Sequence, residues 1–552
     1  MATAQAIPAL TQSGQPILLL REGSTETTGK EAQKNNISAA KVIAEIVRTS
    51  LGPRGMDKML VSSFGDVTIT NDGATILKEM DIEHPAAKMM VEVSKTTDNE
   101  VGDGTTSVVI LTGELLSKAE ALIDKDVHPT IIVDGYRKAE EKSLQLFDEI
   151  AIPVNPLDRD MLKKVSMVSM RSKIVSDSSD YLSDIAVDAV LQVAEESNGK
   201  FVVDLDDIKV EKKTGESMAD TSLIQGIVLD KEVVHAGMPK RIEDANIALI
   251  DGSIEIEKTE FDAKINIETP DQMKIFMDEE TRMIQEMVNT IVSSGANVVI
   301  SQKGIDDVAQ HFLAKKKILG VRRVKKSDME KLAKATGGKV VSNLDSLTTN
   351  DLGKADLVEE RKMGEDDWVF VEGCHNAKAI TIVVRGGAER VVDEAERSIH
   401  DALCVVKDIV QRPKVVVGGG AAEAEVAMQL RSWAQTLTGR EQLAASEFAD
   451  ALEVIPIVLA QNAGLDPIDI KAELTSQHKN GIKWAGVNVF EGKVMDLTKL
   501  DVYEPLVVKE QVVKSATEAA CMILRIDDVI ASGKMAGGGA PPRGGPEESE
   551  FE

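Results

Sequence analysis

The chain has 552 residues, of which 43% are hydrophobic and 28% charged, and its formal net charge is −28 at pH 7. A single hydrophobic core stops growing at roughly 250–300 residues, so we expect two or three soluble globular domains. Nucleic acids and anionic membrane surfaces attract a surplus of lysine and arginine, and this composition argues against both as partners.

Features that would direct the chain out of the cytoplasm are missing from the sequence. The first twenty residues carry no basic stretch ahead of an apolar run, and no segment approaches the roughly 20 apolar residues of a membrane helix. Three cysteines lie far apart with no CxxC pair, which gives no support to a cysteine zinc cluster and favours a reducing compartment. We therefore expect a cytoplasmic protein.

The N-terminal third predicts mostly helices. Residues 1–35 are polar and irregular, and from Ile37 apolar residues recur at helical spacing until Leu51-Gly52-Pro53 ends the run. A short strand is predicted around residues 67–69, with Asn71-Asp72-Gly73 as its turn. A glycine-rich loop then opens a helical run over residues 108–123.

The middle of the chain changes character. Residues 153–222 mix helical and strand patterns, whereas from about residue 245 short apolar strands alternate with helical patterns, which is typical of a parallel α/β layer. The predicted strands are 247–250, 298–301, 318–321, 339–341, 379–384 and 414–417, and the predicted helices are 305–315, 326–335, 388–410, 421–437 and 504–531. The acidic, Gly/Pro-rich tail 536–552 is predicted to be disordered.

The loop GDGTTS, residues 102–107, is the strongest local sign of chemistry. Glycines allow a close approach of backbone to an anion, the hydroxyls of the following residues can donate, and the start of a helix favours phosphate. Asp103 would repel phosphate unless Mg²⁺ bridges the two. A solvated glycine turn is an equally good interpretation of this loop alone, and neither GxxxxGK[ST] nor GxGxxG occurs in the chain.

A second glycine cluster, residues 418–420, also lies between a predicted strand and a predicted helix. It is either a nucleotide contact or simply a tight turn. Taken singly, Asp72 and Asp401 are most simply surface residues, and His400 is a structural one. If these distant elements form one site, the nucleotide domain is discontinuous and encloses the α/β segment.

Considered together and in order, five segments resemble the group II chaperonins, the family of the archaeal thermosome and the eukaryotic chaperonin TRiC/CCT. They are 49–61 (TSLGPRGMDKMLV), 69–77 (ITNDGATIL), 101–107 (VGDGTTS), 385–403 (RGGAERVVDEAERSIHDAL) and 415–420 (VVVGGG).

The resemblance implies a multidomain chaperonin fold with a mostly helical equatorial ATPase domain, an α/β apical domain with a helical protrusion and a small α/β intermediate hinge domain. The implied bounds are 1–151 with 409–535 (equatorial), 152–222 with 377–408 (intermediate) and 223–376 (apical). The protrusion, about residues 254–290, would form a built-in lid. Its methionine-rich helical stripe is either core or an adaptable binding surface, and Pro270 after Thr269 would open its helix.

The resemblance also assigns residue roles toward ATP and Mg²⁺. Asp103 corresponds to the Mg²⁺ ligand, Asp72 and Asp401 to the carboxylates that orient and deprotonate the attacking water, and Lys173 to the γ-phosphate sensor. The phosphate cradle would comprise Gly52, Gly104, Thr105, Thr106 and Ser107, and the ribose side Gly419, Glu504 and Lys509. Because Asp401 belongs to the implied hinge domain, hydrolysis would require hinge closure.

The implied function is ATP-driven folding of unfolded proteins inside a stacked double ring of this chain and its paralogues, with no separate co-chaperonin lid. A small-molecule ATP enzyme would need its own acid–base cluster in the central segment, where the sequence shows none. A non-catalytic acidic scaffold would leave the five segments unexplained.

Overall fold

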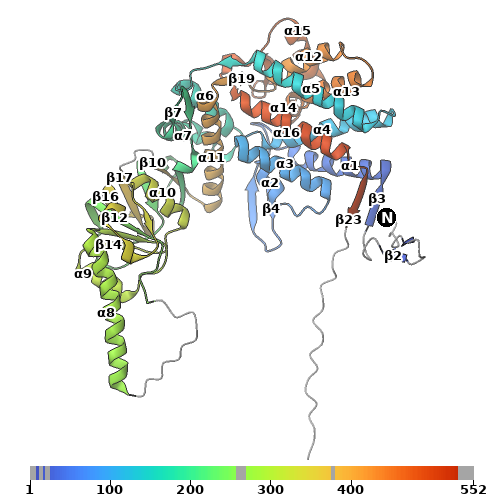
Figure 1. Cartoon of the computed structure of the whole chain (residues 1–552). Helices are drawn as coiled ribbons and strands as arrows, with labels where there is room; N and C mark the ends of the chain where they lie inside the picture. The colour runs from blue at the N-terminus through green and yellow to red at the C-terminus, as the bar shows by residue number, and fades with distance from the viewer. Residues whose placement is uncertain (1–7, 11–15, 19–24, 257–268, 375–378, 532–552) are drawn as a thin grey trace, which may run out of the picture.

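The computed structural model describes residues 8–10, 16–18, 25–256, 269–374 and 379–531. The predicted disordered tail and part of the predicted lid, residues 257–268, lie outside the described residues. Figure 1 shows three parts that follow one another in space: a helical body, a smaller middle part, and a sheet from which one long helix projects. Among the described residues, no helix is both long enough and apolar enough to cross a bilayer.

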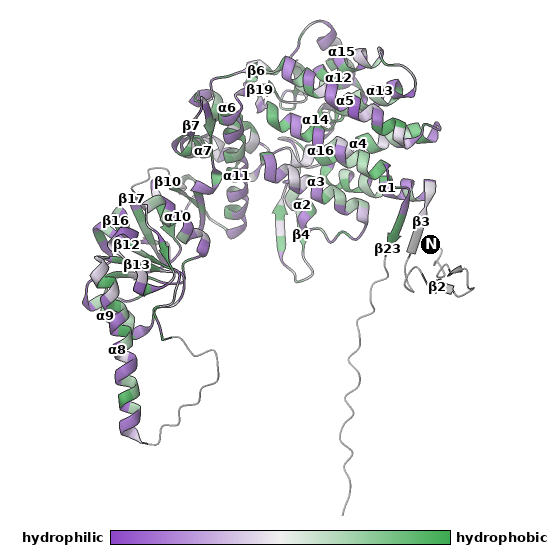
Figure 2. Cartoon of the chain, in the orientation of Figure 1, coloured by the Kyte–Doolittle hydropathy of each residue, from purple (hydrophilic) through white to green (hydrophobic). Residues whose placement is uncertain are grey.

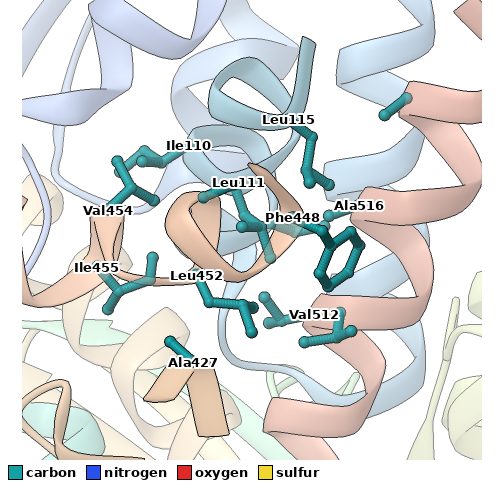
Figure 3. Packing of buried hydrophobic residues seen from close by; sticks show 14 of the residues in the cluster. Ile110, Leu111, Leu115, Ala427, Phe448, Leu452, Val454, Ile455, Val512 and Ala516 are labelled. Atoms are coloured by element: carbon teal, nitrogen blue, oxygen red, sulfur yellow. The ribbon is translucent and has the colours of Figure 1, made fainter. Parts of the chain in front are cut away.

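The helical body combines the two ends of the chain around one hydrophobic core (Figure 3). Within it, α4 is apolar on most of its surface and is surrounded by helices from both chain ends, with Phe448 and Tyr136 packed edge to face inside. The helices are α1 (Gly29–Arg48), α2 (Gly73–Glu79), α3 (Pro85–Val101), α4 (Thr105–Asp124), α5 (Pro129–Ile150), α12 (Ala421–Ala434), α13 (Arg440–Leu452), α14 (Val454–Asn462), α15 (Pro467–Lys479) and α16 (Leu506–Leu524).

Short strand pairs lie around this body. A three-stranded sheet has the order β22-β19-β6, and the other strands form two-stranded pairs. The strands are β1 (Pro8–Leu10) with β2 (Pro16–Leu18), β3 (Thr25–Thr28) with β23 (Asp528–Ala531), β4 (Lys58–Val61) with β5 (Val67–Thr70), β20 (Ala485–Asn488) with β21 (Lys493–Asp496), and β6 (Ile152–Pro153), β19 (Lys414–Val417) and β22 (Tyr503–Pro505).

The middle part has its own core between three helices and a three-stranded sheet of order β10-β18-β9. Its elements are α6 (Arg159–Met170), α7 (Ser179–Val193), β7 (Glu195–Ser197), β8 (Lys200–Val202), β9 (Ile208–Thr214), β10 (Ser222–Ile224), β18 (Ile380–Gly386) and α11 (Glu389–Gln411). The apolar residues of α11 lie on one strongly defined face, which the sheet and the neighbouring helices cover. β18 leads directly into α11, so the sheet and this helix are joined by a short connection.

The third part is a mixed seven-stranded sheet with a core on each face. Parallel pairing joins β12 to β13 and β15, and β13 to β14, while the remaining strands pair antiparallel. Its elements are β11 (Gly226–Leu229), β12 (Arg241–Ile250), α8 (Pro270–Ser294), β13 (Val298–Ser301), α9 (Asp307–Lys315), β14 (Leu319–Val321), α10 (Lys326–Thr336), β15 (Val340–Val341), β16 (Gly353–Met363) and β17 (Asp366–Cys374).

The long helix α8 projects from this sheet and carries a mixed polar and apolar surface (Figures 1 and 2). The Thr269 hydroxyl accepts a hydrogen bond from the Gln272 backbone N–H, so the predicted start of the helix is confirmed. Its first half is exposed, with Met273 at 54% and Met277 at 58%, whereas Ile284 is 4% exposed in the core. The predicted stripe is therefore exposed at one end and part of the core at the other.

Three secondary-structure predictions are wrong. Residues 1–35 are not uniformly irregular, because α1 begins at Gly29 and β3 precedes it. The helix predicted over 504–531 is shorter, since Glu504 lies in β22 and the chain after α16 forms strand β23. The helix predicted over 421–437 ends at Ala434. In the first two cases strand partners distant in sequence override the local pattern: β3 pairs with β23 from the opposite chain end, and β22 pairs with β19.

Candidate active site

The glycine-rich loop joins α3 to α4 in the helical body. Gly102 ends α3 with φ 66° and Gly104 caps α4 with φ 78°, both left-handed conformations that glycine adopts without a steric penalty. A Cβ on Gly104 would also lie 2.7 Å from a methyl carbon of Val512. Gly104 has no side chain to cap the helix and α4 has no side-chain cap hydrogen bond at its positive end, which suits phosphate.

Two aspartates are fixed at this helix end by hydrogen bonds. Asp103 Oδ1 accepts the Gly104 backbone N–H at 2.6 Å. Asp72 caps α2: its Oδ2 accepts the Thr75 N–H at 2.8 Å, and its Oδ1 accepts the Thr105 hydroxyl at 2.9 Å. The turn that holds Asp72 is thus tied to the first residue of α4, and two segments 33 positions apart become one structure.

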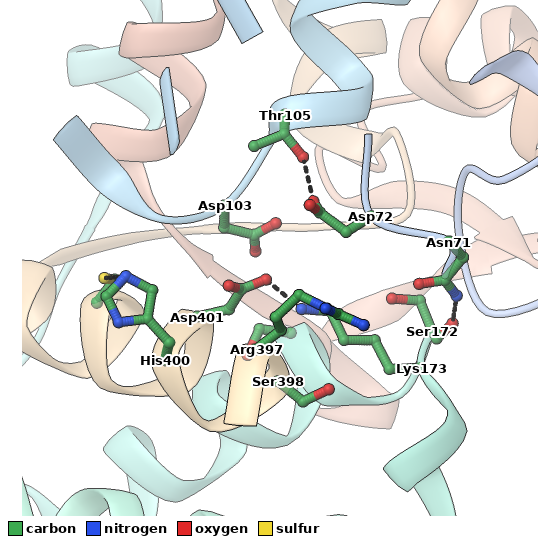
Figure 4. A network of polar contacts seen from close by, with 12 residues as sticks. Asn71, Asp72, Asp103, Thr105, Ser172, Lys173, Arg397, Ser398, His400 and Asp401 are labelled. Atoms are coloured by element: carbon green, nitrogen blue, oxygen red, sulfur yellow. Dashed lines mark hydrogen bonds and ion pairs between the residues drawn. The ribbon is translucent and has the colours of Figure 1, made fainter. Parts of the chain in front are cut away.

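On the opposite side, α11 presents Asp401 and the segment after α6 presents Lys173 (Figure 4). The Lys173 ammonium contacts Asp401 Oδ2, and both residues are about nine-tenths buried. α11 also packs directly on the loop, since a Cβ on Gly102 would lie 2.3 Å from Cys404 Cβ. The site therefore forms where the helical body meets the middle part.

Burial and charge together set the pKa values of this cluster. Burial alone would raise the pKa of Asp72, but Lys173 and the hydrogen bonds from Thr75 and Thr105 outweigh it and lower that pKa. Burial, opposed by Lys173 and reinforced by Asp72 and Asp103, raises the pKa of Asp401. Burial disfavours the charged form of Lys173, yet Asp401 and Asp72 overcome it and raise the Lys173 pKa. The two carboxylates are thus tuned in opposite directions.

A cavity of about 430 Å³ opens beside the loop. A nucleotide-sized ligand fits such a volume. Seven of the predicted residues line it: Gly52, Asp103, Gly104, Ser107, Gly419, Glu504 and Lys509. Five others do not line it: Asp72, Thr105, Thr106, Lys173 and Asp401.

The glycines at this cavity lie against packed apolar side chains. A Cβ on Gly52 would lie 2.3 Å from Leu459 and one on Gly419 would lie 2.3 Å from Leu497. The backbone can therefore border the cavity closely only because these residues are glycines. This cradle, together with a hard carboxylate at Asp103, fits a phosphate chain and the oxygen-ligand preference of Mg²⁺.

The far wall of the cavity is acidic. Lys509 is buried, and its ammonium lies 2.7 Å from Glu423 Oε1 and also contacts Glu504. Burial disfavours charge on this lysine, but Glu423 and Glu504 raise its pKa, so it remains a cation held by two carboxylates. Lys509 thus positions Glu504 rather than reaching toward a phosphate.

Sequence analysis missed several residues that line the cavity, among them Glu423, Asn488 and Phe490. Glu423 could have been found, because it stands three residues after the glycine cluster in the first turn of α12. Asn488 and Phe490 lie at the end of β20 and just beyond it, where their local sequence gave no signal.

The expectation that hydrolysis requires hinge closure stays a prediction, because the structure shows one arrangement of the hinge, with Asp401 at the loop. Asp401 already lies near enough to Asp72 and Asp103 for their charges to raise its pKa. His400 has its ring 3.6 Å from Cys404 Sγ, and burial lowers its pKa, which agrees with the structural role predicted for it.

Comparison with known proteins identifies the family. The sequence matches the TCP-1/cpn60 chaperonin family over residues 43–534. It is 58% identical over 544 residues to thermosome subunit beta of Archaeoglobus fulgidus (98% of this chain, 100% of that one) and 55% identical over 539 residues to the thermosome subunit of Pyrococcus abyssi (98% of each). A solved open-state monomer of a group II chaperonin from Methanococcoides burtonii is 45% identical, with a TM-score of 0.61, covering 77% of this chain and 100% of that one. The chain therefore belongs to the TCP-1/cpn60 chaperonin family, as a group II chaperonin subunit of the thermosome type.

Proposed function

We propose that this chaperonin subunit hydrolyses ATP with Mg²⁺ and uses the reaction to fold other proteins inside a double-ring cavity. The observation that carries the proposal is the meeting of Asp72, Asp103, Lys173 and Asp401 at the start of α4, beside a cavity of nucleotide size. Phosphoryl transfer to water needs positioning and charge neutralisation, which such a set of groups supplies.

Each residue has a distinct task in this proposal. Asp103 would hold Mg²⁺, which when bound neutralises charge on the phosphate chain. Asp401 accepts the proton of the attacking water, because its raised pKa makes it a better base than an ordinary aspartate. Asp72, with its lowered pKa, stays ionised and orients the water.

Lys173 is the residue that connects chemistry to movement. In this structure its ammonium neutralises Asp401. A γ-phosphate would compete for that ammonium, so binding of ATP would release Asp401 to act as a base and would pull on the segment after α6. Loss of the phosphate would reverse this exchange, which is how the lysine would sense the nucleotide.

Separate hydrophobic cores in the helical body, the middle part and the sheet support a division into equatorial, intermediate and apical domains close to the bounds given above. The core of the helical body is drawn from residues 37–150 and 416–524, that of the middle part from residues 162–208 and 380–415, and the two of the sheet from residues 227–371. The middle core thus extends a few residues beyond the proposed boundary at residue 409. In this division α11 carries Asp401 from the intermediate domain to the equatorial site.

Client proteins would be handled by the apical domain. The outer half of α8 exposes Met273, Ile275, Phe276 and Met277, and flexible apolar side chains of this kind bind varied partners. Because the helix projects freely from the sheet (Figure 1), it could close over a cavity as a built-in lid without a separate lid protein.

Assembly with further copies and paralogous subunits is supported by the β4–β5 hairpin. It projects from the helical body and exposes Met59, Val61 and Phe64, the last at 93%, and Met56 is exposed just before β4. A cluster of exposed apolar side chains on a projecting hairpin marks a surface for protein contact. We also propose a cytoplasmic location, on the cysteine content given above.

The experiment that tests this function combines particle mass with turnover and folding. The purified chain should form a particle near a megadalton, hydrolyse ATP only with Mg²⁺, and raise the yield of an unfolded client after ATP is added. A monomer that turns over ATP would favour a small-molecule ATP enzyme, and an assembly without turnover would favour an acidic scaffold.

A further inference from the structure

A buried lysine lies at the boundary between the middle part and the seven-stranded sheet. Lys209, on β9, has a side chain only 6% exposed. Its ammonium donates to the Val228 carbonyl at 2.6 Å and lies 2.9 Å from Glu211 Oε1 and 3.1 Å from Asp328 Oδ2. These partners come from β11, from β9 itself and from α10, so one ammonium joins three elements.

The carboxylates around it are arranged like the ligands of a cation. Glu211, Asp230 and Asp328 each bring one oxygen within 4.8 Å of the others. Two further lysines face the cluster, Lys231 at 2.8 Å from Asp230 and Lys331, whose ammonium donates to the Ile208 carbonyl. Lys325 also faces Asp230 from the start of α10.

The lysines around the three carboxylates are buried to different extents, and Lys209 is the one enclosed among them with its side chain 6% exposed. Burial lowers the pKa of Lys331, whereas Lys231 is partly exposed. Asp328 is 4% exposed, and Lys209 is the cation that contacts its carboxylate among the described residues. Removing one member of such a buried pair leaves an uncompensated charge, which is far more costly than losing a surface pair.

The position of β9 connects this cluster to the active site. β9 pairs in parallel with β18, with Lys209 opposite Thr381, and β18 runs into α11, which carries Asp401. The other partners, β11 and α10, belong to the sheet that carries α8. We propose that Lys209 is an internal cation that couples the sheet to the β9–β18–α11 unit, so that movement of α11 during the nucleotide cycle is transmitted to the lid helix.

Other ion pairs cross the same boundary but are exposed. Lys334 lies 3.3 Å from Asp207 with its side chain 62% exposed, and Lys213 contacts Asp366, which is 65% exposed. Exposed pairs are weakened by water and salt and hold two bodies together poorly. The Lys334–Asp207 pair is therefore a matched control: it joins the same two parts with the same charges in solvent.

The inference rests on the proposed function, and its test uses the assembled full-length chain with Mg-ATP. We would compare the parent with Lys209→Met, Asp328→Asn, the double variant and Lys334→Met. Two quantities are measured on each: steady-state ATP turnover, and the ATP-dependent protection of α8 from protease. Turnover reports on the active site. The ratio of α8 protection with ATP to α8 protection without ATP reports on the coupling.

Lys209→Met is expected to keep turnover within about threefold of the parent while losing most of the ATP-dependent protection, because no residue of the active site is changed. Lys334→Met should behave as the parent in both. The double variant should stay as unprotected as Lys209→Met, because the coupling cation is absent from both. Recovery of protection in the double variant would overturn the inference, because it would show that the loss came from an unpaired buried carboxylate damaging the fold.

Parental protection in Lys209→Met would overturn the inference while leaving the proposed function intact. So would equal losses in Lys209→Met and Lys334→Met, because the buried lysine would then have no special role. If Lys209→Met does not assemble, Asp328→Asn carries the test, and parental protection in that variant would overturn the inference equally. Absence of turnover or protection in the parent would instead refute the proposed function.

Discussion

Lys173 and Asp401 stand 228 positions apart in the chain, and the ammonium of one contacts the carboxylate of the other in a buried site. The pair is close to Asp72 and Asp103, whose negative charges raise the pKa of both partners. A buried lysine shared among three carboxylates leaves a net negative site, which suits a bound divalent cation. The roles proposed for these four residues can be tested by substitution.

Asp401→Asn is expected to reduce ATP turnover by about 10²–10⁴-fold while nucleotide affinity changes little, because the amide cannot accept the proton of the attacking water. Single-turnover hydrolysis and equilibrium binding of a fluorescent nucleotide measure the two effects. Asp393→Asn, on the same helix but partly exposed and paired with Lys212, is the control and should retain parental turnover. Parental turnover in Asp401→Asn would refute the assignment of the base.

Lys173→Met should shift the pH dependence of turnover. Asp401 acts when it is deprotonated, so turnover is present above its pKa and is lost as the pH falls through it. The positive charge of Lys173 lowers that pKa, and removing the charge raises it further, which moves the acidic limb of the pH–rate profile to higher pH. Lys164 lies on α6 and forms an exposed ion pair with Asp501, so Lys164→Met should leave the acidic limb of the pH–rate profile in place. An unmoved limb in Lys173→Met would contradict the electrostatic link.

The two halves of α8 should respond differently to substitution. Replacing Met273, Phe276 and Met277 by serine is expected to weaken client retention after ATP addition while the melting temperature and ATP turnover stay parental, because these side chains are exposed. Ile284→Ser should instead lower stability by about 2–4 kcal/mol, since it places a polar group in a packed core. Client retention is followed by protease protection and stability by thermal melting. Equal effects in both halves would mean that the outer half is also core.

Phe64→Asp is expected to shift the particle toward smaller species, because a carboxylate would replace the most exposed apolar side chain of the β4–β5 hairpin. Native mass measured by light scattering reports the change. Phe64→Leu keeps the residue apolar and should keep the parental mass. A parental mass in the aspartate variant would exclude this part of the hairpin from the subunit contacts.

Asp408→Asn should stabilise the protein above neutral pH. Burial, opposed by Lys407, raises the pKa of Asp408 to about 7, and its Oδ2 has no hydrogen-bond partner within the described part of the chain. The folded state binds its proton more tightly than the unfolded chain, so folding loses stability as the pH rises through the folded pKa. The shift from 3.8 corresponds to at most about 4 kcal/mol at pH 8.

The melting temperature of Asp408→Asn should therefore exceed the parental value at pH 8, and the gain should shrink as the pH falls from about 7 toward 4. Asp408 lies seven residues from Asp401 on α11, so turnover is measured in parallel to show that the site is intact. A gain that does not depend on pH would contradict this account.

The sequence was enough to predict the local elements that have their own start and stop signals. α8 begins where Thr269 and Pro270 predict it, and the glycine loop 102–107 opens α4 as expected. The parallel strands 247–250 and 298–301 were also predicted, because continuous apolar runs between helical patterns have few other solutions. These signals act within a few residues, so tertiary context changes them little.

Only the tertiary structure decided the features that depend on distant partners. β23 is a strand because β3, from the other end of the chain, pairs with it. Glu504 lies in strand β22 because β19 pairs with that strand. The contacts of Lys173 with Asp401 and of Lys209 with Asp328 arise from segments that the sequence separates by more than a hundred residues. The sequence alone determined which residue types can form loops, helix ends and charged pairs. The interaction energies of the charged pairs depend on burial and on the distance between the charges, and both are properties of the folded chain.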